Sequence, residues 1–369
     1  MDDLIAKWRI EQHEIASKTK VLYDSHDEDK GVDAVAGATF SKCSYHIQDK
    51  LIGGVDVSFG DDNSAIAVYV ITRNQQVIYT DSLSYKLSVP YVSSYLAFRE
   101  IEPLEQLVER QKLQSPDLTP EVILVDGNGI LHERRAGLAT FLGVRTGVPT
   151  IGVGKTVYCT DGLSVDLVER GVANNLATFA EHCKAIDMRM GMGMGMPSNN
   201  CANIASDSDR NGGGNKDDIE MNINWVKSSS YINPAASTCT SVPGHAEMGE
   251  QNKRCMGDHV RLISGHCDGF AIPIKGQSGD ILAAAIVGHG GKIAGRGKKK
   301  QQGTKNPIYV SVGHGISLHR AIGVSVALSL ARIPEPVRQA DLIGRAIVKS
   351  GHNSGHLHQE KPSPNKRNK

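Results

Sequence analysis

The order of its short apolar segments limits what this chain can fold into more than any other feature. Between residues 51 and 86, three segments alternate apolar and polar residues or form short apolar runs, with a tight turn at residues 73–75. This pattern predicts three consecutive antiparallel strands. Residues 121–154 then show an apolar strand that ends at Asp126, a helix over about residues 134–142 and a second apolar strand. A strand, helix, strand unit predicts parallel pairing.

Three antiparallel strands followed by this unit, with helices at the end, is the element order of a ribonuclease H-like domain, although other α/β folds share it. We therefore predict an α/β fold: a ribonuclease H-like mixed five-stranded sheet in strand order 3-2-1-4-5, flanked by helices. Helical spacing predicts a leading helix over residues 2–22 and a helix after Ser93 or Ser94, interrupted near Glu100. Two more helices should follow Ser317, separated by a break at residues 334–336.

A long stretch of low complexity divides this domain. Residues 164–258 include MRMGMGMGMPSNN and SDSDRNGGGNKDD, and they greatly exceed the ~12–15 residues of a structureless loop. We predict a disordered insertion; a Met-Gly metal-binding tract is the alternative, but it lacks closely spaced His or Cys ligands. The expected organisation is thus an N-terminal helix (1–22), the two parts of one domain (51–163 and 259–350) around the insertion (164–258), and a flexible basic tail (351–369).

Composition excludes several classes of protein. Lys and Arg (41) balance Asp and Glu (40) to a formal net charge of +1, unlike a disordered acidic chain or a uniformly basic nucleic-acid coat. The 7 cysteines are widely spaced without a C-x-x-C pair, which indicates neither a disulfide framework nor a zinc ribbon. No segment resembles a signal peptide or approaches ~20 consecutive apolar residues. We expect a soluble monomer without a membrane partner, in the cytoplasm, the nucleus or, given its basic tail, the nucleolus.

Two carboxylates are expected side by side in the sheet. Asp56 lies between apolar neighbours on a central strand, where a carboxylate is costly unless it is paired or binds a cation. Asp126 ends the strand that pairs beside it in the predicted order. Two such acids repel unless a divalent cation joins them. The alternatives are a capping or salt-bridged Asp56 and a calcium-loop fragment at DGNG, although no carboxylates follow at EF-hand spacing.

Two further acids complete a possible oxygen cage. Asp341 shares a helix face with Val337, Ala340 and Gly344, and Glu100 stands near a predicted helix break. Glu100 taken alone is equally a solvated helix acid. Oxygen-only ligands select Mg²⁺ or Mn²⁺ over zinc. Such a site activates water and clamps a scissile phosphate, which is the chemistry of phosphodiester hydrolysis.

Five segments together resemble the endonuclease V family, in its eukaryotic form: GGVDVSF, PYVSSYLAFRE, VDGNGILHERRAGLATFLGV, YVSVGH and RIPEPVRQAD. The resemblance covers the leading helix and roughly residues 51–162 and 259–350. It implies a ribonuclease H-like nuclease that uses Mg²⁺, with Mn²⁺ as a substitute. The implied reaction is hydrolysis of the second phosphodiester bond 3′ to inosine in single-stranded RNA, leaving a 5′-phosphate and a 3′-hydroxyl. Deoxyinosine-containing DNA, as in DNA repair, is the other implied substrate.

Residue roles follow from this resemblance position by position. Asp56 and Asp126 match the main metal ligands, which Glu100 and Asp341 support directly or through water. Lys155 matches a lysine near the scissile phosphate, where it would stabilise developing charge; a surface lysine is the alternative. The five are the expected catalytic residues.

The expected nucleic-acid contacts come from loops. Tyr91 matches the family's wedge, an aromatic ring that fills the space left by a flipped base; an ordinary packed tyrosine is the alternative. His132 and His314 are weaker candidates, either for phosphate contact or for supporting the residues that bind the metal, against a purely structural role. The base pocket is expected around Gly53, Gly54, Gly127, Asn128, Gly129 and Leu131. A basic loop is expected to contact phosphates, or to be a solvated hairpin tip: Lys292, Arg296, Lys298, Lys299, Lys300 and Lys305.

Three positions depart from the family pattern. Thr156 stands where relatives usually carry a second lysine, Gly315 where an arginine usually follows the GH pair, and His319 where an acid is common. These departures put phosphate affinity and rate in doubt, while the four acids are intact. Two rival functions remain: an inosine-binding reader that has lost cleavage, which should lack one of the acids, and a structural scaffold assembled through the insertion, which should not depend on metal.

Overall fold

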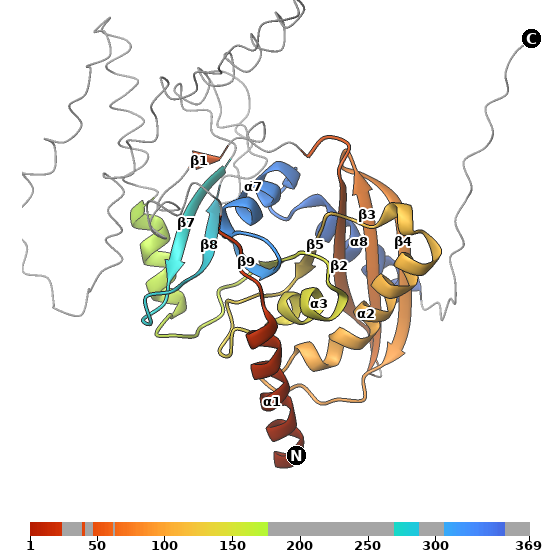
Figure 1. Ribbon diagram of the computed structural model, residues 1–369, viewed down its shortest axis with the longest axis horizontal. Coiled ribbons are helices and arrows are strands. Elements are labelled where there is room, and N and C mark those ends of the chain that lie inside the picture. The colour runs from red at the N-terminus through yellow and green to blue at the C-terminus, as the bar shows by residue number, and fades with distance from the viewer. Residues whose placement is uncertain (24–38, 41–46, 62, 176–268, 288–305, 351–369) are drawn as a thin grey trace, which may run out of the picture.

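The computed structural model describes residues 1–23, 39–40, 47–61, 63–175, 269–287 and 306–350. Within this part of the chain the strands form one mixed nine-stranded sheet in the order β1-β7-β8-β9-β6-β5-β2-β3-β4 (Figure 1). The strands are β1 (Thr39–Phe40), β2 (Leu51–Phe59), β3 (Ser64–Arg73), β4 (Gln76–Lys86), β5 (Val122–Asp126), β6 (Thr150–Gly154), β7 (Gly269–Lys275), β8 (Ile281–Val287) and β9 (Ile308–His314). The helices are α1 (Asp2–Lys18), α2 (Ala97–Gln114), the 3-10 helix η3 (Pro116–Leu118), α3 (Leu138–Thr146), α7 (Leu318–Leu328) and α8 (Glu335–Ser350).

The centre of the sheet confirms the predicted topology. β2, β3 and β4 form an antiparallel meander, and β2, β5 and β6 pair in parallel. Asn74 and Gln75 both take positive φ values in the β3–β4 turn, as a tight two-residue hairpin requires. The predicted count of five strands is wrong, because β9 pairs antiparallel with β6 and is followed outward by β8, β7 and β1. β7, β8 and β9 thus extend the sheet with antiparallel strands.

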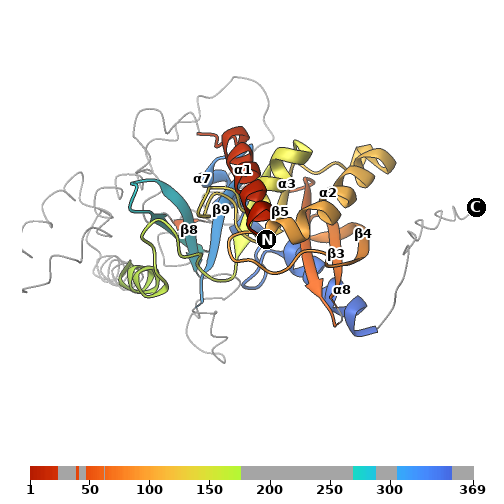
Figure 2. The same cartoon turned by 90° about the horizontal axis from the view of Figure 1, so that it is seen from below.

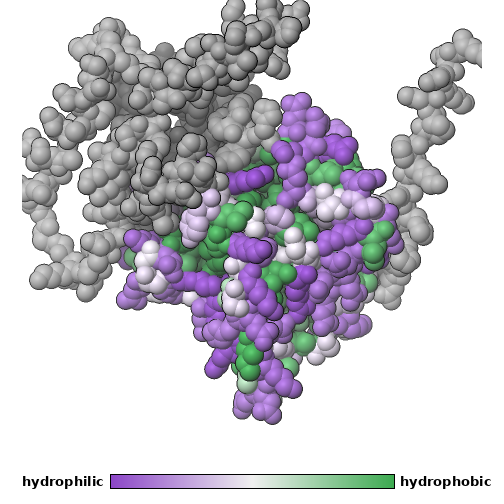
Figure 3. Space-filling model, viewed as in Figure 1, coloured by the Kyte–Doolittle hydropathy of each residue, from purple (hydrophilic) through white to green (hydrophobic). Residues whose placement is uncertain are grey.

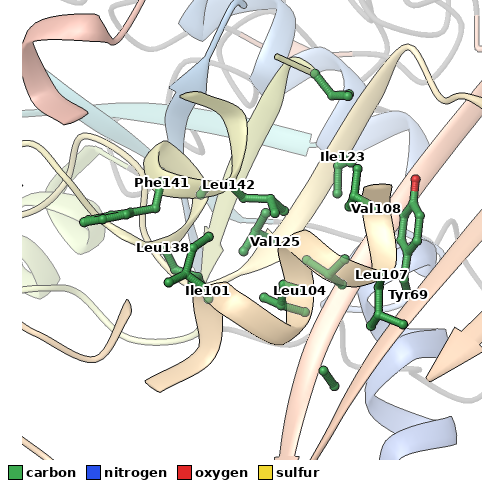
Figure 4. Close-up of a cluster of buried hydrophobic side chains, with 14 of the residues drawn as sticks. Tyr69, Ile101, Leu104, Leu107, Val108, Ile123, Val125, Leu138, Phe141 and Leu142 are labelled. Atoms are coloured by element: carbon green, nitrogen blue, oxygen red, sulfur yellow. The ribbon is translucent and has the colours of Figure 1, made fainter. Parts of the chain in front are cut away.

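Helices cover both faces of the sheet. α2 and α3 lie on one face and α8 on the other, as the view from below shows (Figure 2). α2 and α3 bury a continuous apolar layer against β2, β3 and β5, in which Leu104, Leu107 and Phe141 are fully buried (Figure 4). α1 packs on the same side, where Trp8 stacks on Phe98 with ring centroids 4.9 Å apart. Burial of this layer provides most of the driving force that places α2.

α2 is continuous through the predicted interruption. Pro103 lies inside the helix and cannot donate a backbone N–H to the carbonyl of Arg99, four residues earlier. The hydroxyl of Tyr85 donates to that carbonyl instead, at 3.1 Å. The predicted serine cap is also wrong, because Leu96 is the N-cap residue and makes no side-chain cap bond. Glu100 is therefore a first-turn residue of an unbroken helix.

Two other helix boundaries differ from the sequence pattern. α3 begins at Leu138 rather than near Arg134, because Gly137 is held in the preceding loop by a hydrogen bond from its N–H to the carbonyl of Gly129. α1 ends at Lys18, four residues earlier than predicted. The cap at Ser317 is confirmed, since its side chain accepts from the N–H of Arg320 at the start of α7.

The boundary predicted for the insertion is too early. Residues 165–175, which were assigned to the insertion, are helical. Val168 and Val172 on this segment pack into one apolar cluster with Leu282 and Tyr309, so the segment belongs to the domain. The predictions for residues 176–258, the start of the second part (259–268), the basic loop at 292–305 and the tail at 351–369 lie outside the described residues.

The surface is mainly hydrophilic on the face that carries α1. Figure 3 shows hydrophobic residues there as separate patches among hydrophilic ones. Among the described residues, no helix is both long and apolar enough to cross a membrane.

Candidate active site

The register of β2 and β5 brings two carboxylates together. Val55 pairs with Val125 in parallel, so Asp56 and Asp126 are the next residues on adjacent strands. The two carboxyl groups share a hydrogen bond. Because side chains alternate along a strand, Asp56 lies on the same face as Gly54, which lies against Pro336 at the start of α8. A Cβ at Gly54 would come 2.3 Å from the carbonyl carbon of Pro336, so the glycine permits this close approach.

Two helices each add an acid to this pair. Glu100 is buried in the first turn of α2 and interacts electrostatically with both Asp56 and Asp126. Asp341 lies on α8, which packs across β2 and β3, and its charge also acts on Asp56. Of the four acids that were expected to form an oxygen cage, the other three thus lie within electrostatic range of Asp56.

The acids share an excess of negative charge. Burial, together with the smaller effect of the charges of Asp56 and Asp126, raises the pKa of Glu100 to about 8. The pKa of Asp56 is also raised well above its ordinary value. Burial is the largest cause, and the hydrogen bond with Asp126 and the charge of Asp126 are the next two. Deprotonating all the acids at neutral pH therefore requires added positive charge.

Two cations already partly balance the cluster. Lys155 follows β6, and its Nζ lies 2.5 Å from Oδ2 of Asp126. Burial alone would lower the pKa of Lys155, but the charge and hydrogen bond of Asp126 raise it above its ordinary value. On α8, Arg345 lies one turn after Asp341 and forms a 2.7 Å ion pair with it. Lys155 and Arg345 thus each neutralise one partly exposed carboxylate, that of Asp126 and that of Asp341.

The donor set fits a divalent cation bound through oxygen. Among the described residues, no three acidic, histidine or cysteine side chains converge closely enough to form a ready-made cage. Asp126 and Asp341 instead face Lys155 and Arg345. Binding a metal cation at these acids would require Asp126 to release Lys155 and Asp341 to release Arg345. Four carboxylates and no sulfur or imidazole among them match the preference of Mg²⁺ or Mn²⁺.

Tyr91 lies at the surface beside α2. It belongs to the irregular segment of residues 87–96 between β4 and α2, and its side chain is 67% exposed. The guanidinium of Arg99 lies over its ring at 5.9 Å and over the ring of Phe59 at 5.4 Å. Arg99 and Glu100 are neighbours in the first turn of α2, so this exposed aromatic pair contacts the turn that carries Glu100. Tyr91 is therefore not a packed core tyrosine.

The glycine-rich loop after β5 lies tightly on the sheet. The N–H of Gly129 donates to Oγ of Ser311, and a Cβ there would lie 1.9 Å from the carbonyl oxygen of Val312. The carbonyl of Asn128 accepts from the N–H of Ala139 in α3. Leu131 is fully buried in the apolar cluster around Tyr309 and thus contributes packing.

Other glycines expected at the pocket differ in surroundings. Gly127 has a φ of +147° and forms a bridge to Val153, next to the acids. Gly53 faces the opposite side of β2 from Gly54, and a Cβ there would lie 2.9 Å from Ile123. The lack of a side chain at Gly53 therefore serves the packing of β2 against its neighbours.

The two histidines have different surroundings. His132 is buried, accepts from the N–H of Arg134 at Nδ1, and donates from Nε2 to the carbonyl of Ser94 at 3.0 Å. Burial lowers the pKa of His132 to about 4, so its ring is neutral at pH 7. His314 pairs with Thr150 at the start of β6, whereas Asp126 pairs with Val153 near its end. The structure therefore does not bring His314 to the acids; its Nδ1 accepts from the N–H of Lys20.

The departures from the family pattern lie at the described surface. Thr156 is exposed beside Lys155, so a lysine there would add positive charge next to the acids. Gly315 has a φ of +68°, and its N–H donates to the carbonyl of Lys20. His319 lies in the first turn of α7, away from β5.

The site also contains residues that the sequence patterns did not indicate. Arg332 donates from Nη2 to the carbonyls of Lys155 and Pro307, and so holds the lysine's backbone. Arg345 and Arg99 were likewise missed. The i, i+4 spacing of Asp341 and Arg345 is a signal that could have identified their ion pair. No local signal points to Arg332, since its contact with Lys155 spans 177 residues.

Comparison with known proteins assigns the family. The family model described as Endonuclease V matches residues 38–190 and 272–342, more than half of the chain. Endonuclease V from human is 28% identical over 302 residues, which cover 81% of this chain and 71% of that protein. Endonuclease V from mouse is 32% identical over 302 residues, covering 81% of this chain and 60% of that protein.

Solved structures agree. The catalytic domain of human Endonuclease V is 26% identical with a TM-score of 0.57, covering 95% of this chain and 98% of that one. Endonuclease V from Ciona intestinalis, solved with a 24mer DNA containing an inosine followed by a ribo-adenosine, is 24% identical with a TM-score of 0.54 and shows the same fold; it covers 95% of this chain and 100% of that one. Together with the family model, these likenesses confirm the predicted fold class and the resemblance, and the chain belongs to the endonuclease V family of nucleases.

Proposed function

We propose that this nuclease hydrolyses the second phosphodiester bond 3′ to inosine in single-stranded RNA, with deoxyinosine-containing DNA as an alternative substrate, and depends on Mg²⁺. The products would be a 5′-phosphate and a 3′-hydroxyl. The observation that carries the proposal is the hydrogen-bonded pair of Asp56 and Asp126 on adjacent strands, with Glu100 buried behind it. The relative from Ciona intestinalis, solved with inosine-containing DNA, supports the choice of base.

Each acid has a distinct part in this scheme. Asp56 and Asp126 hold the metal directly, while Glu100 and Asp341 support them or orient water. When bound, the divalent cation supplies an activated water and stabilises negative charge on the scissile phosphate. The raised pKa values of Asp56 and Glu100 favour such a cation, because binding it relieves the mutual repulsion of the carboxylates.

Lys155 is proposed to leave Asp126 and turn to the phosphate. Its Nζ is half-buried beside the acids, and Arg332 fixes the backbone behind it. An ammonium in this position stabilises charge that develops on a phosphoryl oxygen. Lys155→Met should therefore lower kcat by about 100-fold or more, with a smaller effect on KM.

Tyr91 is proposed to act as the wedge. Its ring is exposed and lies beside Arg99 in the first turn of α2, the turn that carries Glu100, so it is free to enter an unstacked base step. The glycine-rich loop after β5 would supply main-chain contacts to the flipped base, since Gly127, next to the acids, has no side chain to cover its backbone.

One gel tests this function. The substrates are an end-labelled single-stranded RNA with one inosine, its adenosine counterpart and a deoxyinosine DNA, each with Mg²⁺ or EDTA. We expect wild type to cut only the inosine-containing strands, only with Mg²⁺, at the second bond on the 3′ side. Asp56→Asn should abolish cleavage, whereas Asp117→Asn, an exposed acid on η3, should cleave normally.

The other outcomes assign the rival roles. Cleavage of the DNA alone would replace the RNA substrate by a repair substrate. Retention of inosine RNA in a binding assay without any cut would replace the enzyme by the inert reader. Cleavage that persists in EDTA would refute metal dependence.

A further inference from the structure

A fully buried glutamine on α1 joins three segments near Tyr91. Gln12 has no exposed surface. Its Nε2 donates to the carbonyl of Ser94 at 2.7 Å, and its Oε1 accepts from Nε of Arg134 at 2.5 Å. One side chain therefore links α1, the irregular segment of residues 87–96 and the loop after β5. We call residues 87–96 the Tyr91 loop.

Ser94 is the point at which the Tyr91 loop is held. Its carbonyl accepts two hydrogen bonds, from Nε2 of Gln12 and from Nε2 of His132. Its hydroxyl lies 2.6 Å from the hydroxyl of Tyr158. Ser94 also has a φ of +69°, a conformation that a residue with a side chain adopts only when its surroundings hold it there.

Tyr91 depends on this anchor for its position. Its ring is largely exposed, so packing of its own side chain does little to orient it. The N–H of Tyr95 donates to the carbonyl of Val92 and closes a turn between the tyrosine and the anchored serine. Holding the carbonyl of Ser94 in place therefore restrains the backbone position of Tyr91.

We propose that Gln12 is a positioning residue that holds the Tyr91 loop in the conformation in which Tyr91 replaces a flipped base. The inference rests on the proposed wedge function of Tyr91. It gives α1 a part in substrate recognition although α1 carries none of the four acids. Removing the carboxamide would leave the carbonyl of Ser94 with one donor fewer and deprive Nε of the partly buried Arg134 of its acceptor.

The chain offers a matched control. Gln111 on α2 is also fully buried, and its Nε2 donates to the carbonyl of Ser115 at 2.8 Å. Gln111→Met therefore removes a bond of the same kind from a place without contact to the Tyr91 loop. Gln12→Glu is the second test variant, because it keeps an acceptor for Arg134 but cannot donate to Ser94 when ionised.

The first measurement needs no substrate. Amide hydrogen exchange in the peptide that covers the Tyr91 loop should rise by about tenfold in Gln12→Met and Gln12→Glu, because a lost hydrogen bond makes local opening easier. Gln111→Met should leave that peptide unchanged. Unaltered exchange in both Gln12 variants would refute the anchoring role, whether or not the protein cleaves inosine strands.

The second measurement is a double-mutant cycle on cleavage of inosine RNA. Gln12→Met should lower kcat/KM by about tenfold in the wild-type background and by less than about twofold in Tyr91→Ala, since coupled residues are not additive. Equal losses in both backgrounds would show that Gln12 does not act through Tyr91. If wild type does not cleave the inosine strand, the proposed function fails, while the exchange measurement still decides the anchoring.

Discussion

The hydroxyl of Tyr85 and the carbonyl of Arg99 form a hydrogen bond that stands in for one that α2 cannot make. Pro103 has no N–H to donate to this carbonyl, and Tyr85 on β4 donates to it across the interface at 3.1 Å. The first turn of α2, with Glu100 next to this carbonyl, is therefore tied to the sheet.

We expect Tyr85→Phe to weaken this end of α2. A partly buried carbonyl loses its donor, which should lower the free energy of unfolding by about 1 kcal/mol. Urea denaturation measures the change, and Tyr23→Phe, at an exposed tyrosine, is the control. Equal midpoints for the two variants would mean that water replaces the hydroxyl without loss.

Magnesium should stabilise the fold through the acids. At a concentration tenfold above its Kd, Mg²⁺ should add about 1.4 kcal/mol to the stability of wild type, seen as a higher Tm. Asp56→Asn and Asp126→Asn should lose the shift, and the exposed Asp117→Asn should keep it. Arg345→Ala should respond at lower Mg²⁺, since Asp341 no longer has a competing cation. A shift that survives in both aspartate variants would place the cation elsewhere.

His132 should make stability depend on pH below neutrality. Its folded pKa of about 4 lies below the ordinary value of 6.5, so between these values the unfolded chain binds a proton that the folded chain does not. Stability is therefore fully present above pH 6.5 and falls as the pH drops toward 4, by at most about 3 kcal/mol. Urea unfolding at pH 7, 6 and 5 should show a flatter dependence for His132→Gln than for wild type. Parallel pH dependences would show that the pKa of this histidine is the same in the folded and the unfolded chain.

Gly54→Ala should be more damaging than an alanine at another glycine. The new methyl group would overlap the backbone of Pro336 and push α8 from β2, at a cost of about 3 kcal/mol. Gly147→Ala is the comparison, because nothing lies within 4 Å and only its φ of +70° opposes the change, at about 1 kcal/mol. The Mg²⁺-induced Tm shift should also shrink in Gly54→Ala alone. If the two variants unfold alike, the close approach is not rigid.

The sequence predicted the local parts of the site well. Strand order placed Asp56 beside Asp126, because pairing of neighbouring strands follows from short apolar segments and a crossover helix. The helical face of α8 correctly indicated that Asp341 turns toward the sheet. Both inferences depend on periodicity, which is a property of consecutive residues.

Long-range partners decided the rest. The break predicted in α2 does not occur because Tyr85, 14 residues before Arg99, supplies the missing donor. His314 was expected near the phosphates, but the antiparallel register of β6 and β9 carries it to the other end of β6. Gln12 escaped notice because its partner Ser94 is 82 residues away. None of these contacts leaves a pattern among neighbouring residues.

The segment after α1 crosses the end of the sheet opposite the acids. The N–H of Lys20 donates to Nδ1 of His314, and Val21 forms a bridge to Ile316. These contacts attach the chain at the end of β6 opposite Lys155. Tyr23, exposed just beyond, is consequently a suitable point for attaching a fluorophore or a surface anchor. An immobilised or labelled protein of this kind would leave the acidic end accessible to a nucleic acid strand.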